Sequence, residues 1–245
     1  MSGATTAPTR TIDGVEVPPA GTYGIDAPHT LAGFFVKHLM ISRVRGSFSD
    51  VSGSITIAED PTQSTVEVEI GIQSIHTRDE NRDAHLRSGD FFEAEAYPKM
   101  TFKSTSVSHV DGDEWAVVGD LTIKGVTKPV TLKTTFEGAE TAPEAMGGST
   151  SIGFSASAKL NREDWGLTYN AALESGGIVI GKDIDIILRN NDRPFLAALR
   201  PQPAVIDIQP EYIGRRAVER LLWRIDNLDS PAEKVAIAPK LLEAP

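Results

Sequence analysis

Hydrophobic and polar positions alternate with a period of two over most of the chain from residue 21 to residue 190. The clearest segment is 65–72, where Val66, Val68, Ile70 and Ile72 are separated by polar residues or glycine. Successive side chains of a β-strand point to opposite faces, so such a segment has one apolar and one polar face. The pattern predicts half-buried strands, and helical periodicity is nearly absent from this region.

The same alternation predicts further strands at residues 22–25, 30–39, 46–57, 100–107, 114–123, 130–136, 152–160 and 178–189. Short turn sequences, such as Asp111-Gly112-Asp113, separate neighbouring segments and allow them to pair as hairpins. A sheet of about eight long strands with one apolar face is expected to close on itself. The sequence therefore predicts an all-β fold, an antiparallel up-and-down β-barrel.

Two parts of the chain depart from this pattern. Residues 77–89 are polar and end in glycine, which favours a short helix at the barrel mouth. After residue 190 three prolines predict a linker, followed by a strand at 204–209 and an amphipathic helix. The predicted organisation is a disordered leader (1–20), the barrel (21–190), a Pro-rich linker (191–203) and a strand–helix–strand-like C-terminal appendage (204–245). The apolar positions of the appendage helix are Ile213, Ala217, Leu221 and Ile225.

Composition excludes several classes of function. The net charge of -10 disfavours nucleic acid as a partner, because affinity for phosphates comes from Lys and Arg. The absence of cysteine excludes disulfides, thiolate catalysis and iron–sulfur clusters. The first twenty residues lack the apolar run of a secretory signal, and no window is long and apolar enough for a membrane span, so we expect a cytoplasmic protein without stable membrane insertion.

Catalytic and metal motifs are weak. His29, His38, His76 and His85, with Asp79 or Asp83, have no metal-site spacing, and loop or core histidines explain them more simply. Gly176 and Gly181-Lys182 resemble a phosphate-binding loop, but Asp183 replaces its Ser or Thr, and a strand follows instead of a helix. No Gly-x-Ser-x-Gly elbow is present. We therefore expect no enzyme activity, no metal and no cofactor.

Several separated motifs resemble the YceI-like polyisoprenoid-binding family over about residues 21–190. They are Asp26 to Thr30, Phe34 to His38, Gly46 to Phe48, Arg82 to Phe92, Tyr97-Pro98, Gly119 to Thr127, Gly153-Phe154 and Asn161 to Gly166. The resemblance implies an extended lipocalin-like barrel that encloses an isoprenoid chain. The last forty residues, from Gln209-Pro210 to Leu241, look like the end of a lac-repressor-type (LacI/GalR) effector domain, without the rest of such a domain.

The candidate ligand-binding residues are the apolar strand positions of one face and their neighbours. They are Phe34, Val36, His38, Phe48, Val68, Ile70, Phe92, Phe102, Leu121, Ile123, Phe154, Ala156 and Ile186. Alternation alone fits a barrel filled by its own side chains equally well, and the family resemblance favours a cavity. Arg82, Asp83 and Arg87 are candidates for binding a ligand head group, or for an Asp83–Arg87 pair on a surface helix.

The function predicted from the sequence is binding of a long isoprenoid-type lipid, a polyprenol or a quinone-like tail, which the protein sequesters or carries without catalysis. A homodimer is compatible with this prediction. One alternative is an enzyme that acts on a small apolar substrate in the barrel and uses His38. The other is a regulatory protein that binds a partner through its C-terminal helix.

The predicted linker implies that residues 191–245 are dispensable for the barrel. A lone strand–helix–strand has too small a core to fold by itself or to support another domain. A chain that ends at Asn190 is expected to unfold cooperatively and to retain its lipid, as measured by thermal melting and organic extraction. An insoluble or ligand-free product would show that the tail belongs to the functional unit.

Overall fold

The computed structural model describes residues 9–39, 42–142, 148–170, 179–190, 205–207 and 240–242. The chain divides into two compact units, residues 1–191 and residues 192–245. Within the described ranges, no helix has the length and apolar character needed to span a membrane.

The first unit is built almost entirely of strands, with one α-helix, α1 (Glu80–Arg87), and short 3-10 turns. The strands are β1 (Arg10–Ile12), β2 (Val15–Val17), β3 (Gly21–Gly24), β4 (Thr30–His38), β5 (Ser42–Phe48), β6 (Val51–Ile57), β7 (Thr65–Gly71), β8 (Ile75–His76), β9 (Lys99–Asp111), β10 (Glu114–Ile123), β11 (Val126–Thr141), β12 (Thr150–Asn161) and β13 (Ile180–Asn190). The 3-10 turns are η1 (Ala27–His29), η2 (Pro61–Gln63), η3 (Ile72–Ser74) and η5 (Arg162–Trp165).

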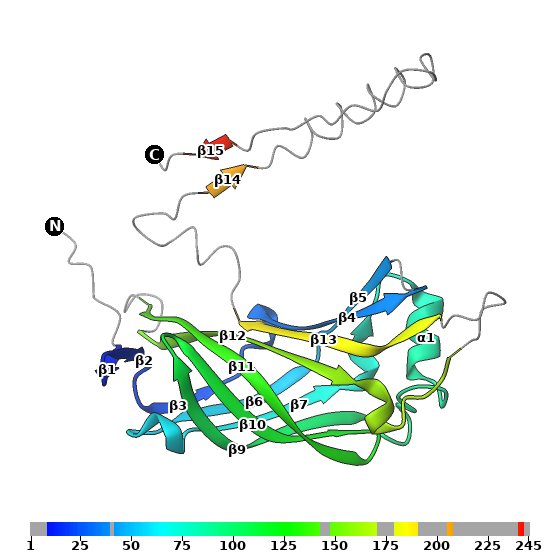
Figure 1. The fold of residues 1–245 in the computed structure, drawn as a ribbon, viewed down its shortest axis with the longest axis horizontal. Coiled ribbons are helices and arrows are strands. Elements are labelled where there is room, and N and C mark those ends of the chain that lie inside the picture. Colours follow the sequence, from blue (N-terminus) through cyan, green and yellow to red (C-terminus); the bar gives the residue numbers. More distant parts are fainter. Residues whose placement is uncertain are drawn as a thin grey trace. The chain divides into compact units, whose positions relative to one another are not determined.

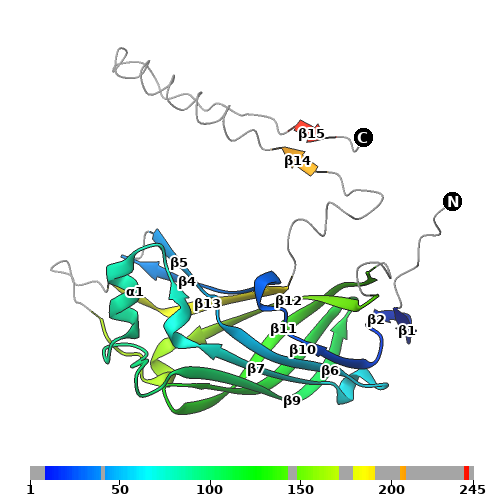
Figure 2. The same cartoon turned by 180° about the vertical axis from the view of Figure 1, so that it is seen from behind.

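An 11-stranded antiparallel sheet forms the body of this unit, in the order β3-β6-β7-β9-β10-β11-β12-β13-β4-β5-β8. Consecutive strands from β9 to β13 pair as a meander, as the turn sequences predicted. The sheet curls strongly, and α1 lies at one end of it (Figures 1 and 2). The predictions of an all-β antiparallel fold and of a short helix near residues 77–89 are therefore confirmed.

The predicted closed barrel of about eight strands needs correction. Within the described residues the pairings run from one edge strand, β3, to the other, β8, so the architecture is a curled sheet or half-barrel. The predicted strand at 46–57 is two strands, because β5 pairs with β4 and β8 whereas β6 pairs with β3 and β7. Alternation of side chains did not reveal this break, since both strands are amphipathic.

The turn between β5 and β6 and the bend after β7 are hydrogen-bonded to each other, and at each of them the chain changes from one part of the sheet to another. The Gly71 amide donates to the Asp50 carbonyl at 2.8 Å, which joins the end of β7 to the turn between β5 and β6. The Ser49 amide donates to Ser74 Oγ at 3.2 Å, and that hydroxyl donates to the Gly71 carbonyl at 2.7 Å. A β-carbon on Gly71 would lie 2.1 Å from an Asp50 carboxylate oxygen, so this crossing favours glycine.

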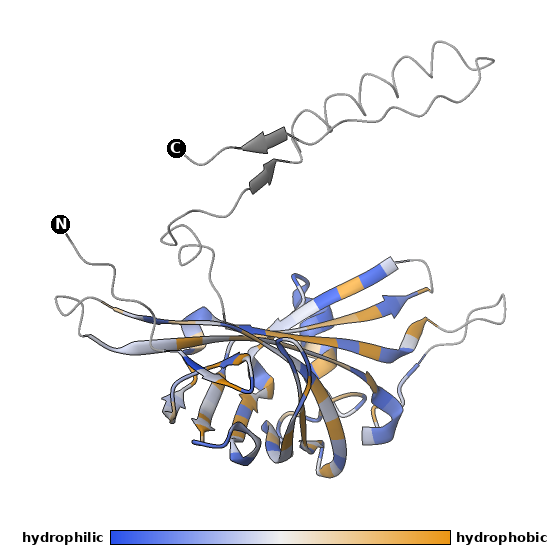
Figure 3. Ribbon diagram, turned by 60° about the vertical axis from the view of Figure 1, so that its left-hand side comes forward, coloured by the Kyte–Doolittle hydropathy of each residue, from blue (hydrophilic) through white to orange (hydrophobic). Residues whose placement is uncertain are grey.

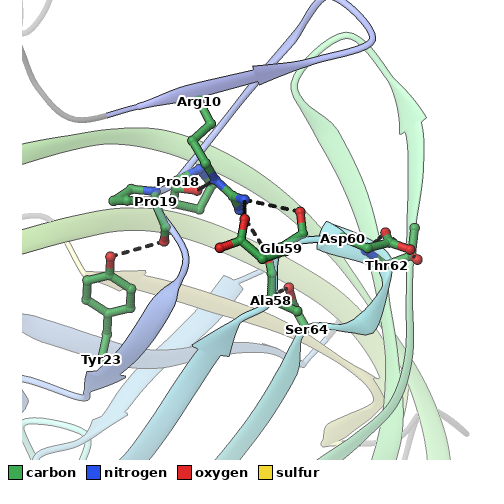
Figure 4. Close-up of polar contacts among 9 residues, drawn as sticks. All are labelled: Arg10, Pro18, Pro19, Tyr23, Ala58, Glu59, Asp60, Thr62 and Ser64. Atoms are coloured by element: carbon green, nitrogen blue, oxygen red, sulfur yellow. Dashed lines mark hydrogen bonds and ion pairs between the residues drawn. The ribbon is translucent and has the colours of Figure 1, made fainter.

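The prediction of a disordered leader is wrong for residues 10–17, because β1 and β2 form an antiparallel hairpin there. Arg10 anchors this hairpin, as Figure 4 shows. Its Nη1 lies 2.7 Å from Glu59 Oε2, its Nη2 donates to the Ala58 carbonyl at 2.9 Å, and its Nε donates to the Pro18 carbonyl at 3.1 Å. These long-range contacts are invisible to an argument from local composition.

Apolar and polar residues alternate along the strands (Figure 3), and the apolar ones form two clusters. The main cluster contains the almost fully buried Ile72 and Ile75, together with aromatic residues from β4, β5, η5 and the segment after α1. The smaller cluster contains Ile57, Ala139 and Ile152, with Phe154 packed against it. The interior is therefore divided, and only the main cluster includes residues next to α1.

In the second unit, β14 (Val205–Asp207) pairs antiparallel with β15 (Lys240–Leu242). The first of these strands overlaps the predicted strand at 204–209. The predicted linker at 191–203 and the helix with Ile213, Ala217, Leu221 and Ile225 lie outside the described residues. The domain boundaries given above stay predictions.

The contact between β6 and β7 generates a stability prediction for Gly53. Its φ is +143°, and a β-carbon there would lie 2.1 Å from the Glu67 carbonyl oxygen. Gly53→Ala is therefore expected to lower the free energy of unfolding by roughly 2 kcal/mol or more in urea denaturation. Gly24→Ala on the neighbouring β3 is the control, because a β-carbon there meets nothing within 4 Å. Equal effects of the two changes would contradict the argument.

Candidate functional site

An apolar cavity of about 100 Å³ lies within the main cluster. Side chains from β4, β5, α1, β9, β10, β12, η5 and β13 line it, together with the segments after α1 and after η5. The lining residues are Phe34, Val36, Phe48, Leu86, Phe91, Phe92, Met100, Ile123, Leu160, Arg162, Trp165, Leu167, Ile180, Ile184 and Ile186. Arg162 is the one charged residue in this set. The arrangement suits an apolar ligand.

Three aromatic rings form one part of the lining. The Phe34 and Phe48 ring centroids are 5.8 Å apart, and the Phe48 and Phe92 rings meet edge-to-face at 6.1 Å. Gly46, which faces Phe34 across the β4–β5 pair, leaves room for the Phe34 ring, since a β-carbon there would lie 2.2 Å from Phe34 Cζ. The register of β4 and β5 thus places a ring and a glycine opposite each other and turns the ring toward the cavity.

The turn after β12 contributes two buried side chains. Asn161 caps η5 by accepting a hydrogen bond from the Glu163 amide at 3.1 Å, and Gly166 ends the turn at a φ of +73°. Trp165 is 3% exposed, and its indole Nε1 donates to the Leu121 carbonyl at 3.0 Å. The capped turn therefore holds Trp165 against the sheet and places Arg162, the first residue of η5, in the cavity wall.

Arg162 is 3% exposed, which is unusual for arginine. Its Nε donates to the Gly181 carbonyl at 3.0 Å, and its Nη1 donates to the Leu167 carbonyl. Burial lowers the pKa of the Arg162 guanidinium, and the negative charge of Glu163 opposes part of this shift. The side chain joins η5, the following segment and β13.

A polar network holds α1 beside the cavity. Asp79 caps the helix by accepting from the Arg82 amide at 3.0 Å. The buried Asp83 carboxylate accepts from the Thr77 amide at 2.8 Å and lies 3.3 Å from His76 Nδ1. Burial alone would raise the pKa of Asp83, but the hydrogen bonds from Thr77 and the contact with His76 outweigh it and hold this pKa below its usual value.

The three head-group candidates of the sequence analysis have structural partners in this network. Arg82 donates to the Thr77 hydroxyl and carbonyl, both at 2.7 Å. Arg87 donates to the carbonyls of Gln73 and Ile75 at 3.1 and 2.8 Å. The Asp83–Arg87 pair is replaced by the contacts of Asp83 with Thr77 and His76. A head-group role for these residues stays a prediction.

The structure brings part of the predicted ligand-binding set together. The predicted residues that line the cavity are Phe34, Val36, Phe48, Phe92, Ile123 and Ile186. Val68, Ile70 and Leu121 pack against the same cluster outside the lining. Phe154 belongs to the smaller cluster, where its ring centroid lies 5.5 Å from that of Phe136.

The other predicted residues lie elsewhere on the sheet. Phe102 is buried over Gly119, and Ala156 is opposite Leu188 on β13. His38, on which the enzyme alternative depends, ends β4 opposite Ile180 and is outside the lining. Ligand contact by any of these residues remains a prediction.

Sequence reasoning missed several lining residues for two different reasons. Met100, Leu160 and Ile184 share strand parity with Phe102, Ala156 and Ile186, so the alternation could have identified them. Phe91, Arg162 and Leu167 lie in irregular segments or turns, where alternation gives no information about direction. The family motifs contained Arg162 and Trp165 without indicating that their side chains reach the interior.

The histidines beside acidic residues form pairs instead of metal clusters. His29 Nδ1 lies 2.8 Å from Asp26, and His85 Nε2 lies 2.8 Å from Asp90. Across the described residues, no three His, Asp or Glu side chains are grouped so that they could hold a metal ion. His85 belongs to α1, whereas Asp26 and His29 lie just before β4.

The chain is similar to several known proteins. The YceI-like domain family matches residues 23–190. UPF0312 protein SAS2572 of Staphylococcus aureus (strain MSSA476) is 42% identical over 164 residues, which cover 66% of this chain and 91% of that protein. The Campylobacter jejuni YCEI protein has a TM-score of 0.50 at 31% identity and covers 64% of this chain and 90% of its own.

Burkholderia cenocepacia BcnA shares the fold, with a TM-score of 0.57 at 19% identity over 67% of this chain and 97% of its own. The family match ends at residue 190. The C-terminal resemblance to a lac-repressor-type domain therefore stays a prediction.

The Asp83 network generates a prediction about stability and pH. Asp83→Asn is expected to lower the free energy of unfolding by about 1–3 kcal/mol at pH 7 because it weakens the hydrogen bonds from Thr77. The folded-state pKa of Asp83 lies below its unfolded value, so its stabilisation is present above about pH 4 and is lost as the pH falls through the folded-state pKa. The measurement is urea denaturation of both proteins at pH 7 and pH 3. The difference in free energy of unfolding between Asp83→Asn and the unaltered protein should be smaller at pH 3 than at pH 7.

The control for this prediction is Asp120→Asn, which changes an exposed carboxylate on β10 and should have little effect at either pH. An Asp83→Asn effect of the same size at both pH values would contradict the assigned pKa direction.

Proposed function

The chain belongs to the YceI-like family, and from this premise we propose that it binds an isoprenoid-type lipid in its apolar cavity. The ligand class is a polyprenol or a molecule with a quinone-like tail, which the protein sequesters or carries without a catalytic step. The cytoplasmic location and the homodimer stay predictions.

The observation that carries this proposal is the composition of the cavity lining. Apart from Arg162, every lining residue is aliphatic, aromatic or Met. Transfer of a methylene group from water into such surroundings contributes about 0.8 kcal/mol. About ten buried methylene equivalents would contribute roughly 8 kcal/mol, near micromolar affinity before the entropic costs of binding.

The size of the cavity limits how the ligand binds. The cavity has a volume of about 100 Å³. It accommodates a short segment of an isoprenoid, and a longer chain requires the lining side chains to separate. Met100 and Leu86 have flexible side chains that suit such a rearrangement, because unbranched and γ-branched residues have several accessible rotamers.

The proposal is tested by isolating the full chain without detergent and analysing it by native mass spectrometry and organic extraction. The expected result is a bound apolar molecule with repeating isoprene units. A ligand-free protein that also binds no added polyprenol would overturn the proposal.

A matched pair of variants tests whether the cavity is the binding site. Ile186→Phe adds volume at a lining position and is expected to lower lipid occupancy at least severalfold. Ile187→Phe changes the next residue of β13, which faces the other side of the sheet, and should retain the lipid. Equal occupancy in the two variants, measured by native mass spectrometry, would place the lipid outside this cavity.

A further inference from the structure

We infer that Arg162 recognises the polar head of the ligand, and that its Nη2 donates a hydrogen bond to an oxygen acceptor, with a carboxylate or phosphate preferred over a neutral oxygen. This inference rests on the proposed function and specifies the ligand as an amphiphile whose oxygen group is drawn into the cavity wall.

The unpartnered donor of Arg162 is the first observation. Its Nε and Nη1 bind the carbonyls of Gly181 and Leu167, whereas Nη2 is buried and has no hydrogen-bond partner. In the part of the chain that the structure describes, no other buried side-chain nitrogen or oxygen lacks a partner. Buried polar groups in proteins are nearly always hydrogen-bonded, so a lone exception in a cavity wall points to a missing acceptor.

The charge of Arg162 is the second observation. Both of its protein partners are neutral carbonyls, and the adjacent Glu163 pairs with Lys182 at 2.9 Å. No ion pair of Arg162 occurs among the described residues. A buried cation is stabilised by a nearby anion, and guanidinium groups bind carboxylates and phosphates with favourable geometry. An anionic head group would supply the missing acceptor and the missing negative charge together.

The location of Arg162 separates it from the other arginines near the site. Arg82 and Arg87 donate to main-chain carbonyls and to Thr77 around α1, and neither lines the cavity. Arg162 lines the cavity together with residues such as Phe34 and Ile186. The cavity surface itself is apolar, and Nη2 lies buried directly behind it, so the oxygen group of an amphiphile reaches this donor when the neighbouring lining side chains separate.

Three ligands with the same carbon skeleton test this assignment: farnesoic acid, farnesol and the saturated hydrocarbon farnesane. Each is titrated at pH 8 into the full chain loaded with the neutral fluorescent probe N-phenyl-1-naphthylamine, and displacement gives the apparent affinity. Farnesoic acid is expected to bind on the order of tenfold or more tightly than farnesane, with farnesol between them, because hydrogen bonds to charged groups are the stronger ones.

Two substitutions then test whether Arg162 causes this preference. Arg162→Met removes the donor and the charge but keeps much of the apolar length, and it is expected to bring farnesoic acid to the affinity of farnesane. Arg162→Lys keeps the charge with fewer directed donors, and the preference should fall at least threefold. Arg43→Met removes an exposed arginine on β5 and is the control for the change in net charge. If Arg162→Met does not fold, the lysine variant decides the test.

The outcomes distinguish this inference from the proposed function. If none of the three ligands displaces the probe, the proposed function is wrong. Equal displacement by farnesoic acid and farnesane would support lipid binding and overturn the assignment of Arg162. A preference for the acid that is unchanged in both Arg162 variants would also overturn it and would place head-group recognition elsewhere, for example at the α1 arginines.

Discussion

The hydrogen bonds around Asp50 and Gly71 are the constraint on which the curled sheet depends. They hold the turn between β5 and β6 against the end of β7, so that consecutive segments of the chain pair in different parts of the sheet. Without this crossing, β5 and β8 would not meet, and α1, which follows β8 closely, would lose its position beside the cavity. The backbone crossing therefore separates β6 and β7 from β5 and β8 in the sheet order, and the curl of the sheet brings apolar residues of distant strands into one cluster.

Close packing of rings against glycine determines the shape of the interior. Phe34 occupies the space left by Gly46, and Phe102 occupies the space left by Gly119 on the neighbouring strand. The cavity that remains within the main cluster has a volume of about 100 Å³. The proposed ligand site is thus a gap within the main apolar cluster.

The one cation in this lining has a different origin from the apolar residues around it. Arg162 is held by a capped turn and by two main-chain carbonyls, so its position follows from the backbone of η5 and β13. A guanidinium has more donors than these two carbonyls can satisfy. The two carbonyl contacts therefore fix the turn, and Nη2 of Arg162 binds neither carbonyl. The same residue thus has a structural role through Nε and Nη1 and the proposed role of recognising a ligand oxygen through Nη2.

The sequence by itself determined the strand content, the approximate strand limits and the short helix, because alternation and turn residues are local properties. It also identified lining residues such as Phe34, Ile123 and Ile186, which lie on the apolar faces of regular strands. It failed where long-range contacts decide the outcome. The hairpin clamped by Arg10, the break between β5 and β6 and the placement of Phe154 in a separate cluster depend on residues far apart in the chain. Only the tertiary structure placed Arg162 in the cavity wall, because a turn has no periodicity from which the direction of its side chains can be derived, and burial of a charge depends on what the rest of the fold packs around it.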